Sequence, residues 1–238
     1  MHMENTWAFI FARGGSKGIP RKNLQELNGL PLIAHSIEKA NQCSAIRRVI
    51  LSTDCEEIAE VGKKHGAEVP FIRPKNLASD TSSEVDAWRH AIMETKTCFG
   101  EEVGTFVSLP PTSPFRSERD ISNAIELYRS TESDLVVSVT DAARNPYFNM
   151  VSIDEMGLIK IAAPGPTGQR IVRRQDAPQV FDLTTVVYVA SPSYVLGCDG
   201  LLDGRVRAIN VPAIRALDID TPLDLEFARF IAAKSDKK

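Results

Sequence analysis

The chain has 238 residues, 43% hydrophobic and 25% charged, with a net charge of −3 at pH 7. This length suffices for one large domain with a substantial core, and the slight acidic balance argues against a general nucleic-acid binder. No apolar run reaches 18 residues and no signal-peptide pattern opens the chain, so we expect no membrane partner and no export by that route.

The first 140 residues alternate short apolar runs with segments of helical period. Predicted strands are 7–12, 47–53, 67–72, 105–109 and 134–139, and predicted helices start at Pro31 and cover 55–65, 84–95 and 121–128. The strands are apolar throughout, which indicates a mostly parallel, doubly wound, Rossmann-like α/β sheet covered on both faces.

The alternation breaks in residues 141–180, which are rich in proline, glycine and basic residues and have little helical period. We expect β-hairpins here that leave the main sheet. Strands are predicted again at 184–190 and 205–211, followed by a helix from Pro222 to about Ala233 with Thr221 as its N-cap. The sequence therefore predicts one domain over residues 1–238 with 141–180 inserted.

The cysteines carry no sign of a metal site. None of the four belongs to a CxxC pair, so neither a zinc site nor a disulfide framework is predicted. A reducing cytoplasm is the simpler interpretation. The four are Cys43, Cys55, Cys98 and Cys198.

The segment "ARGGSKGIPRKN" (12–23) follows the first predicted strand. It is neither a Walker loop, because Ile19 follows Gly18, nor a GxGxxG fingerprint, and Pro20 blocks the expected helix. A glycine-rich turn with several cations at the end of a parallel strand suits a triphosphate. A flexible solvated loop is the alternative. The cations are Arg13, Lys17, Arg21 and Lys22.

Two acids, Asp218 and Asp220, precede the final predicted helix. In an extended segment, residues two apart project to the same side, so both carboxylates can face one cation. Mg²⁺ prefers a few carboxylates together with phosphate oxygens and water. The alternative is a solvated acidic turn.

The segment "FARGGSKGIPRKNL" resembles the N-terminal signature of the acylneuraminate cytidylyltransferases, the CMP–sialic acid synthetases. The resemblance continues through "LNGLPLIAHSIEKA", "VILSTD", "RPKNLASDTSS", "PPTSPFR" and "LDIDTPLDL", in the family's order, and leaves chiefly 141–180 weakly matched. It implies transfer of CMP from CTP to the anomeric hydroxyl of a nine-carbon α-keto acid sugar, with release of pyrophosphate. It also implies Mg²⁺ as cofactor and a homodimer formed through 141–180.

For the nucleotide, the resemblance implies triphosphate contacts and a base pocket. Arg13 and Lys22 would contact the triphosphate, and Asp220 would join them in catalysis. An Asp or a metal-bound water could deprotonate the sugar hydroxyl. The other implied nucleotide contacts are the backbones of Gly14, Gly15 and Ser16, together with Asn23, Arg73 and backbone groups near Ser82.

Three of these neighbouring residues also have an ordinary structural interpretation. Asn23 could equally cap a helix or form a turn. For Asp80 and Thr81 the competing interpretation is turn or N-cap chemistry before the helix at Glu84, and for Asp80 we favour it.

The sugar site departs from the family pattern. Arg174 and Gln175, in "RRQDAPQVF", and Tyr188 match family sugar-site positions, although a surface charge and a core aromatic are alternatives for Arg174 and Tyr188. Pro110 stands where these enzymes typically have Gln, and Phe148 where a Lys is expected. "FDLTTVVY" also replaces an FRPNGAIY-like stretch. These changes imply a sugar such as legionaminate or pseudaminate beside N-acetylneuraminate.

Two other functions fit parts of the pattern. A metal-dependent glycosyltransferase of GT-A-like fold also uses a DxD, but normally after a strand in mid-chain. A non-catalytic nucleotide-binding protein could keep the basic loop but would not need the paired acids.

Overall fold

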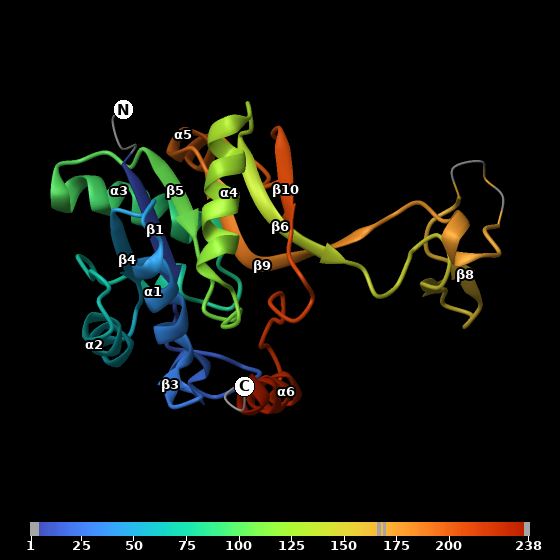
Figure 1. Ribbon diagram of the computed structural model, residues 1–238, viewed down its shortest axis with the longest axis horizontal. Helices are drawn as coiled ribbons and strands as arrows, with labels where there is room; N and C mark the ends of the chain where they lie inside the picture. The colour runs from blue at the N-terminus through green and yellow to red at the C-terminus, as the bar shows by residue number, and fades with distance from the viewer. Residues whose placement is uncertain (1–4, 166–167, 169, 236–238) are drawn as a thin grey trace.

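The computed structural model describes residues 5–165, 168 and 170–235 (Figure 1). The strands are β1 (Thr6–Phe11), β2 (Glu26–Leu27), β3 (Leu30–Pro31), β4 (Arg48–Ser52), β5 (Thr105–Ser108), β6 (Leu135–Asp141), β7 (Val151–Ile153), β8 (Ile159–Ile161), β9 (Phe181–Ala190) and β10 (Val206–Asn210). The helices are α1 (Leu32–Gln42), α2 (Glu56–Lys64), α3 (Glu84–Phe99), α4 (Glu118–Ser130), α5 (Pro192–Gly197) and α6 (Pro222–Ser235). Short 3₁₀ helices cover Lys22–Leu24, Lys75–Leu77 and Arg174–Asp176.

The central sheet has the strand order β10-β6-β9-β5-β1-β4. Strand β9 runs antiparallel to both of its neighbours, and the remaining pairs are parallel. The predicted mostly parallel α/β sheet is therefore confirmed. The carboxyl ends of the five parallel strands meet at one edge of the sheet, where such folds bind their ligands.

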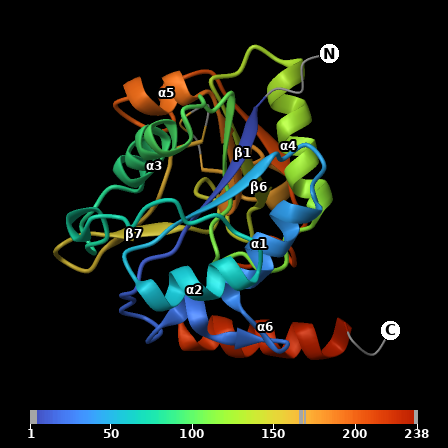
Figure 2. The same cartoon turned by 90° about the vertical axis from the view of Figure 1, so that its left-hand side faces the viewer.

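Helices cover both faces of the sheet, as Figure 2 shows. Helices α1, α2 and α4 pack on one face, and α3 and α5 on the other. Successive side chains of β1 alternate between these cores: Trp7 and Phe9 face α3, whereas Ala8 and Ile10 face α1. All four are fully buried, which explains why the strand has no polar alternation.

The third predicted strand, 67–72, is wrong. Only Glu68 joins the sheet, through a single bridge to Ile50 of β4. Pro70 has no backbone N–H and cannot continue the ladder, so the segment leaves the sheet at once. The other differences are additions, because α5 and the small hairpin of β2 and β3 were not predicted.

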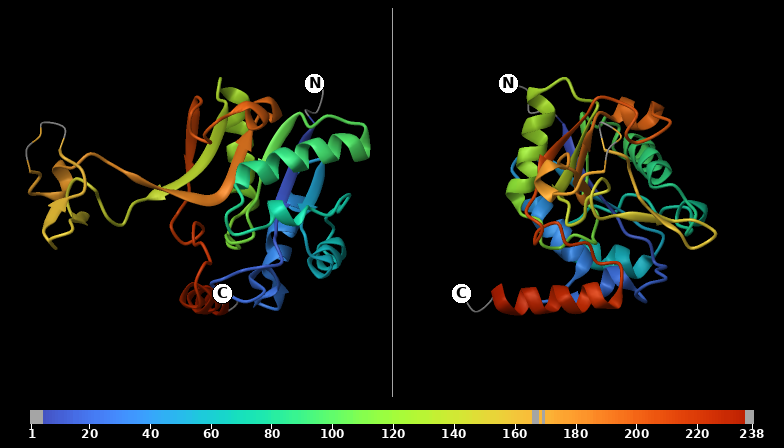
Figure 3. Two further views of the ribbon diagram at one scale, coloured as in Figure 1. Left: turned by 180° about the vertical axis from the view of Figure 1, so that it is seen from behind. Right: turned by 90° about the vertical axis from the view of Figure 1, so that its right-hand side faces the viewer.

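Strands β6 and β9 lead into an arm, residues 142–180, that lies away from the sheet (Figures 1 and 3). Its regular structure is the hairpin of β7 and β8, held by antiparallel pairing of Val151 with Ile161. Its side chains are largely exposed. Across the described parts of the chain, no helix combines the length and apolar character needed to cross a membrane.

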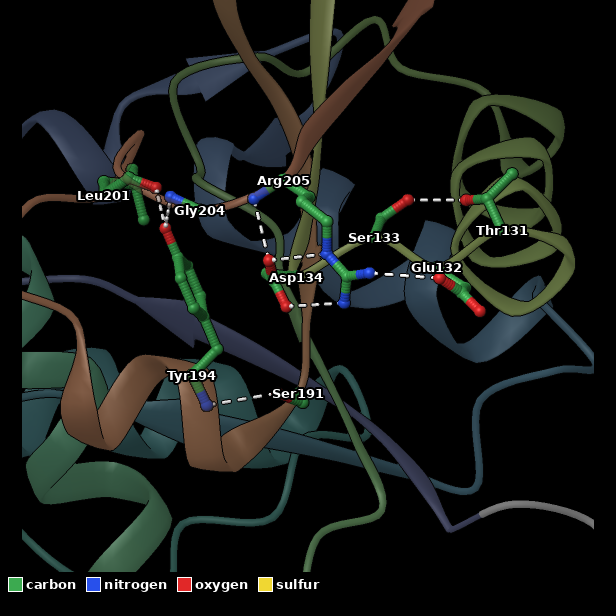
Figure 4. Close-up of polar contacts among 9 residues, drawn as sticks. All are labelled: Thr131, Glu132, Ser133, Asp134, Ser191, Tyr194, Leu201, Gly204 and Arg205. Atoms are coloured by element: carbon green, nitrogen blue, oxygen red, sulfur yellow. Dashed lines mark hydrogen bonds and ion pairs between the residues drawn. The ribbon is translucent and has the colours of Figure 1, made fainter.

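The amino ends of β6 and β10 are joined by a polar network (Figure 4). Asp134 accepts the backbone N–H of Arg205 at 2.7 Å and pairs with its guanidinium. The Tyr194 hydroxyl donates to the Leu201 carbonyl at 2.8 Å and accepts the Gly204 N–H at 3.0 Å. A Cβ at Gly204 would lie 2.6 Å from the Tyr194 ring, so only glycine fits. Asp134, Tyr194 and Arg205 therefore find their partners within the fold.

Candidate active site

A cavity of about 410 Å³ opens at the carboxyl edge of the sheet. Its walls come from the loop after β1, the segment before α3, the loop after β5, the middle of β9 and the segment before α6. The polar residues that line it are Arg13, Lys22, Asn23, Arg73, Ser79, Asp80, Ser82, Ser83, Glu84, Thr112, Thr185, Asp218 and Asp220. Most residues predicted from sequence to bind the nucleotide and the metal are thus brought together.

The basic loop after β1 has a defined fold. The Gly14 N–H donates to Asp54 Oδ1 at 2.8 Å, and Asn23 Nδ2 donates to the Arg13 carbonyl at 2.9 Å. Asn23 therefore holds the loop in shape and also lines the cavity. These internal contacts argue against the flexible solvated loop.

The glycines of this loop serve close packing. None of Gly14, Gly15 and Gly18 has a positive φ. A Cβ on Gly18 would lie 2.3 Å from the Asp220 carbonyl oxygen, so Gly18 lets the basic loop touch the segment that carries the acids. A Cβ on Gly15, in contrast, would have no atom within 4 Å other than those of Gly15 and its chain neighbours. Gly14, Gly15 and Ser16 flank the cavity without lining it.

Acids hold the cations of the loop. Lys22 Nζ lies 2.8 Å from Asp220 Oδ1. Arg13 and Lys17 each lie 2.8 Å from an oxygen of Asp80, and the hydrogen bond from Lys17 is the main cause that lowers the pKa of that carboxyl. Asp80 and Thr81 lie in a turn, as the turn interpretation predicted, but Asp80 does not cap α3, because Ser83 is the residue before that helix. Asp80 instead bridges two walls of the cavity.

Arg73 is the cation in this cavity that lacks an internal partner. Its side chain is only 5% exposed, and within the described residues its guanidinium has no hydrogen bond or ion pair. Burial lowers its pKa, while the nearby Asp54 opposes this effect. Ser82 lines the same wall and donates its hydroxyl to the Asn76 carbonyl at 2.7 Å. A buried arginine without a partner is suited to a ligand acceptor.

Asp218 and Asp220 differ in their surroundings. Burial raises the pKa of Asp218, opposed by hydrogen bonds from Thr112 and Thr185, and its Oδ1 is buried without a partner. Asp220 is exposed and paired with Lys22. The described residues hold no group of three or more metal-ligating side chains, so a cation here would need ligand oxygens as well. That donor set, with its orphaned oxygen, fits Mg²⁺ bound beside phosphates.

Comparison with known proteins decides the family. The family described as "Cytidylyltransferase" matches residues 7–156, which include the basic loop, Arg73 and the loop after β5. The chain is a member of the cytidylyltransferase family. It is therefore a nucleotidyltransferase, and this membership does not support the glycosyltransferase alternative.

Two relatives and one solved structure illustrate the match. The cytidylyltransferase is 34% identical to a CMP-N,N'-diacetyllegionaminic acid synthase of Campylobacter jejuni, over 93% of this chain and 92% of the relative. It is 31% identical to a pseudaminic acid cytidylyltransferase of the same species, over 93% and 94%. The structure of CMP:2-keto-3-deoxy-manno-octonic acid synthetase complexed with CTP superposes with a TM-score of 0.72 at 17% identity, covering 97% of this chain and 99% of that one. The last match supports the fold alone.

The predicted sugar residues of this cytidylyltransferase lie outside the cavity. Arg174 and Gln175 line a separate hollow of about 250 Å³ at the base of the arm, where Arg174 donates to the Ala143 carbonyl at 3.2 Å. Tyr188 is 5% exposed and packs on Trp88 with ring centroids 5.4 Å apart. Burial raises the pKa of Tyr188, and the nearby Glu84 and Asp218 add to the shift. Within one chain, these residues do not line the cavity that contains Arg13, Lys22 and Arg73.

Sequence reasoning missed Arg116, at the end of "PPTSPFR". Its guanidinium is fully buried and donates to Ser36 Oγ at 2.7 Å and to the carbonyls of Pro110 and Thr185. Burial lowers the pKa of Arg116 to about 9, which leaves it charged at neutral pH. Arg116 thus ties the loop after β5 to β9 behind the cavity. The sequence signal that could have identified Arg116 was its place at the end of an apolar, proline-rich motif, where a charged residue is unexpected.

Thr112, Thr185 and Glu84 were also missed as lining residues of the cavity. Thr112 lay inside a quoted motif, and Thr185 lay in a stretch noted only for departing from the family. Because β9 is antiparallel and enters the sheet between β5 and β6, its position beside the loop after β5 depends on topology that the sequence pattern does not specify.

Proposed function

We propose that this cytidylyltransferase joins CMP from CTP to the anomeric hydroxyl of a nonulosonic acid and releases pyrophosphate. The observation that carries the proposal is one cavity that combines paired loop cations, a buried arginine without a partner and an orphaned aspartate oxygen. A nucleoside triphosphate supplies acceptors for the cations, and a metal ion bound with it would supply the partner for the aspartate oxygen.

The loop cations act by neutralising charge. When the sugar hydroxyl attacks the α-phosphorus, negative charge builds on the leaving pyrophosphate, so catalysis is mainly positioning and charge neutralisation. Arg13 and Lys22 exchange their carboxylate partners for phosphate oxygens. Arg73 binds acceptors of the nucleotide on the opposite wall, beside Ser82.

Asp218 and Asp220 are the residues that would hold Mg²⁺, which would add positive charge beside the phosphates. Two contacts hold the segment Asp218–Asp220 in position. Gly18 packs on the Asp220 backbone, and the Ile219 N–H donates to the Thr112 carbonyl at 2.9 Å. These contacts hold the two carboxylates against the loop after β5.

For the acceptor sugar we propose a nonulosonate of the legionaminate or pseudaminate type, beside N-acetylneuraminate. Relatives that match nearly the whole chain are named for the first two sugars. The presence of Pro110 and Phe148, where an amide and a cation occur in the sialic acid enzymes, agrees with a changed substituent pattern.

A homodimer through the arm is part of the proposal. The hairpin presents exposed apolar side chains that nothing in the described chain covers, among them Ile153, Met156, Leu158 and Ile159. Arg174 and Gln175 also lie on this arm, so assembly would decide whether they reach a sugar. A cytoplasmic location is proposed because all four cysteines are free.

The test is pyrophosphate release from CTP and Mg²⁺ with a panel of nonulosonic acids that includes legionaminate, pseudaminate and N-acetylneuraminate. We expect release with at least one member and a matching CMP-sugar by mass spectrometry. A folded protein that binds CTP and releases no pyrophosphate with any of them would favour the non-catalytic alternative.

A further inference from the structure

Glu84 is an acidic residue of the cavity that has no basic side chain as a partner. It stands in the first turn of α3 and lines the cavity with its side chain exposed to that space. The other two exposed acids of the cavity, Asp80 and Asp220, are paired with basic residues at 2.8 Å. In the described part of the chain, Glu84 makes no ion pair.

The groups near Glu84 differ from those near the cations of the cavity. Desolvation by the cavity walls raises the pKa of its carboxyl, the nearby Trp88 indole opposes this shift, and the nearby Asp218 adds to it. Two aromatic residues lie near Glu84. They are Tyr188, whose pKa is raised by the charge of Glu84, and Trp88, whose indole is one turn further along α3. The charges that act on Arg73 are instead those of Asp54 and Arg13.

The cavity therefore has two chemically different ends. Arg13, Lys22 and Arg73 form a cationic end suited to phosphates and nucleotide acceptors. At the other end, Glu84 lies near Asp218, which contacts Thr112 and Thr185, and in the described chain no basic side chain pairs with Glu84. A carboxylate is a hydrogen-bond acceptor only, so this end selects a ligand that presents donors.

We propose that Glu84 is a specificity-determining residue, which accepts a hydrogen bond from a hydroxyl or amide N–H of the acceptor sugar. This inference rests on the proposed function, because the sugar is the substrate that carries such donors next to the reacting hydroxyl. Pro110, which also lines the cavity, offers no side-chain hydrogen-bond partner, so Glu84 supplies polar recognition of the sugar. The carboxylate also repels the anionic groups of both substrates, and so directs the sugar's donor-bearing side toward α3.

The test compares Glu84→Ala and Glu84→Gln with Asp86→Asn. Asp86 lies in the same first helical turn and pairs with Arg89 at 3.1 Å, outside the cavity, so it controls for loss of a negative charge at the helix start. With the best sugar of the panel, we expect Glu84→Ala to lower kcat/KM for the sugar by about 10- to 100-fold, the size of a lost hydrogen bond to a charged group. Glu84→Gln, which keeps one acceptor oxygen, loses less. KM for CTP, the melting temperature and the kinetics of Asp86→Asn stay near wild type.

A second comparison identifies the donor. Deoxy or N-deacylated sugars that lack one donor are assayed with wild type and Glu84→Ala. The analogue that lacks the relevant donor loses the same factor in the wild type and nothing further in the variant. Additive losses for every analogue would overturn the assignment.

Other outcomes separate this inference from the proposed function. A Glu84→Ala effect on KM for CTP alone, or an equal effect of Asp86→Asn, would overturn the role of Glu84 while sugar turnover by the wild type stands. A wild type that turns over no sugar would overturn the proposed function and this inference together.

Discussion

The network of Asp134, Tyr194 and Arg205 at the amino edge of the sheet and the cavity at the carboxyl edge treat polar groups in opposite ways. At the amino edge, Asp134, Tyr194 and Arg205 use their polar groups on one another and on nearby backbone (Figure 4). At the carboxyl edge, Nε of Arg73 and Oδ1 of Asp218 are buried without partners. Because an unpaired buried polar group costs free energy, the carboxyl edge is the place where a ligand completes the structure.

The difference teaches how to separate structural from functional residues in this chain. A residue that is satisfied within the fold should affect stability when it is changed. A residue left unsatisfied, or paired only with a neighbour that a ligand would displace, should affect turnover. Substitutions at both edges of the sheet test this division.

Arg116→Met tests the buried arginine that ties the loop after β5 to β9 behind the cavity. Removing the guanidinium leaves Ser36 Oγ and the carbonyls of Pro110 and Thr185 with one donor fewer, so we expect a loss of about 3 kcal/mol in the free energy of unfolding. Turnover falls as well, because the loop after β5 lines the cavity. Urea unfolding measures the first effect, and a stability within 1 kcal/mol of wild type, roughly the net value of one hydrogen bond, would contradict this role.

Gly18→Ala tests the close approach of the basic loop to the acidic segment. The added Cβ meets the Asp220 carbonyl oxygen, so Asp220 or Lys22 must shift, and we expect turnover to fall by about 100-fold. Gly15→Ala is the matched control for stability, because its Cβ enters open space at an ordinary φ. Equal melting temperatures and unimpaired turnover for Gly18→Ala would show that the contact has no functional role.

Tyr194→Phe tests the amino edge. The hydroxyl bonds the Leu201 carbonyl and the Gly204 N–H, so its removal should cost about 1 kcal/mol, or roughly 2–4 °C in Tm. Pyrophosphate release at 25 °C should stay unchanged, because the group lies at the opposite edge from the cavity. A kinetic defect without a stability loss would break the division between the two edges.

Asp134→Asn gives the smallest effect and a pH signature. The side-chain and backbone hydrogen bonds from Arg205 lower the pKa of Asp134 in the fold. A lowered pKa means that the ion pair stabilises the fold above the unfolded value, about pH 4, and that this stability is lost as the pH falls through the folded pKa. The Tm difference between wild type and variant should therefore be present at pH 7 and shrink below about pH 4. A difference that grows toward acid would contradict the ion pair.

Much of the fold could be predicted from sequence, because the buried parallel strands and amphipathic helices carry strong local patterns. The failure at 67–72 has a local cause in Pro70, whose missing donor outweighs the apolar composition. Topology was less accessible: the insertion of β9 between β5 and β6 is a long-range pairing, and it alone brings Thr185 to the cavity.

In the site, too, some features were predictable from sequence and others were not. The family resemblance brought Arg13, Lys22 and the two aspartates into one prediction, whereas composition and spacing alone left a solvated loop and an acidic turn open. The partners of these residues were not predictable, because the pairing of Asp80 with Arg13 and Lys17 depends on two loops far apart in sequence. The same holds for Arg116, whose acceptors lie on three separate segments.

Asp220→Asn tests the central claim most directly, with pyrophosphate release and Tm measured on the same preparation. Asp220 is exposed and paired with Lys22, so its replacement should leave Tm within about 1 °C of wild type, as expected for an exposed ion pair. Turnover should fall by at least about 100-fold, the size of effect seen when a charge-stabilising group is removed from an active site. Retained turnover, or a collapse in Tm that accounts for the lost activity, would contradict the account of the carboxyl edge as a site held for CTP and its metal.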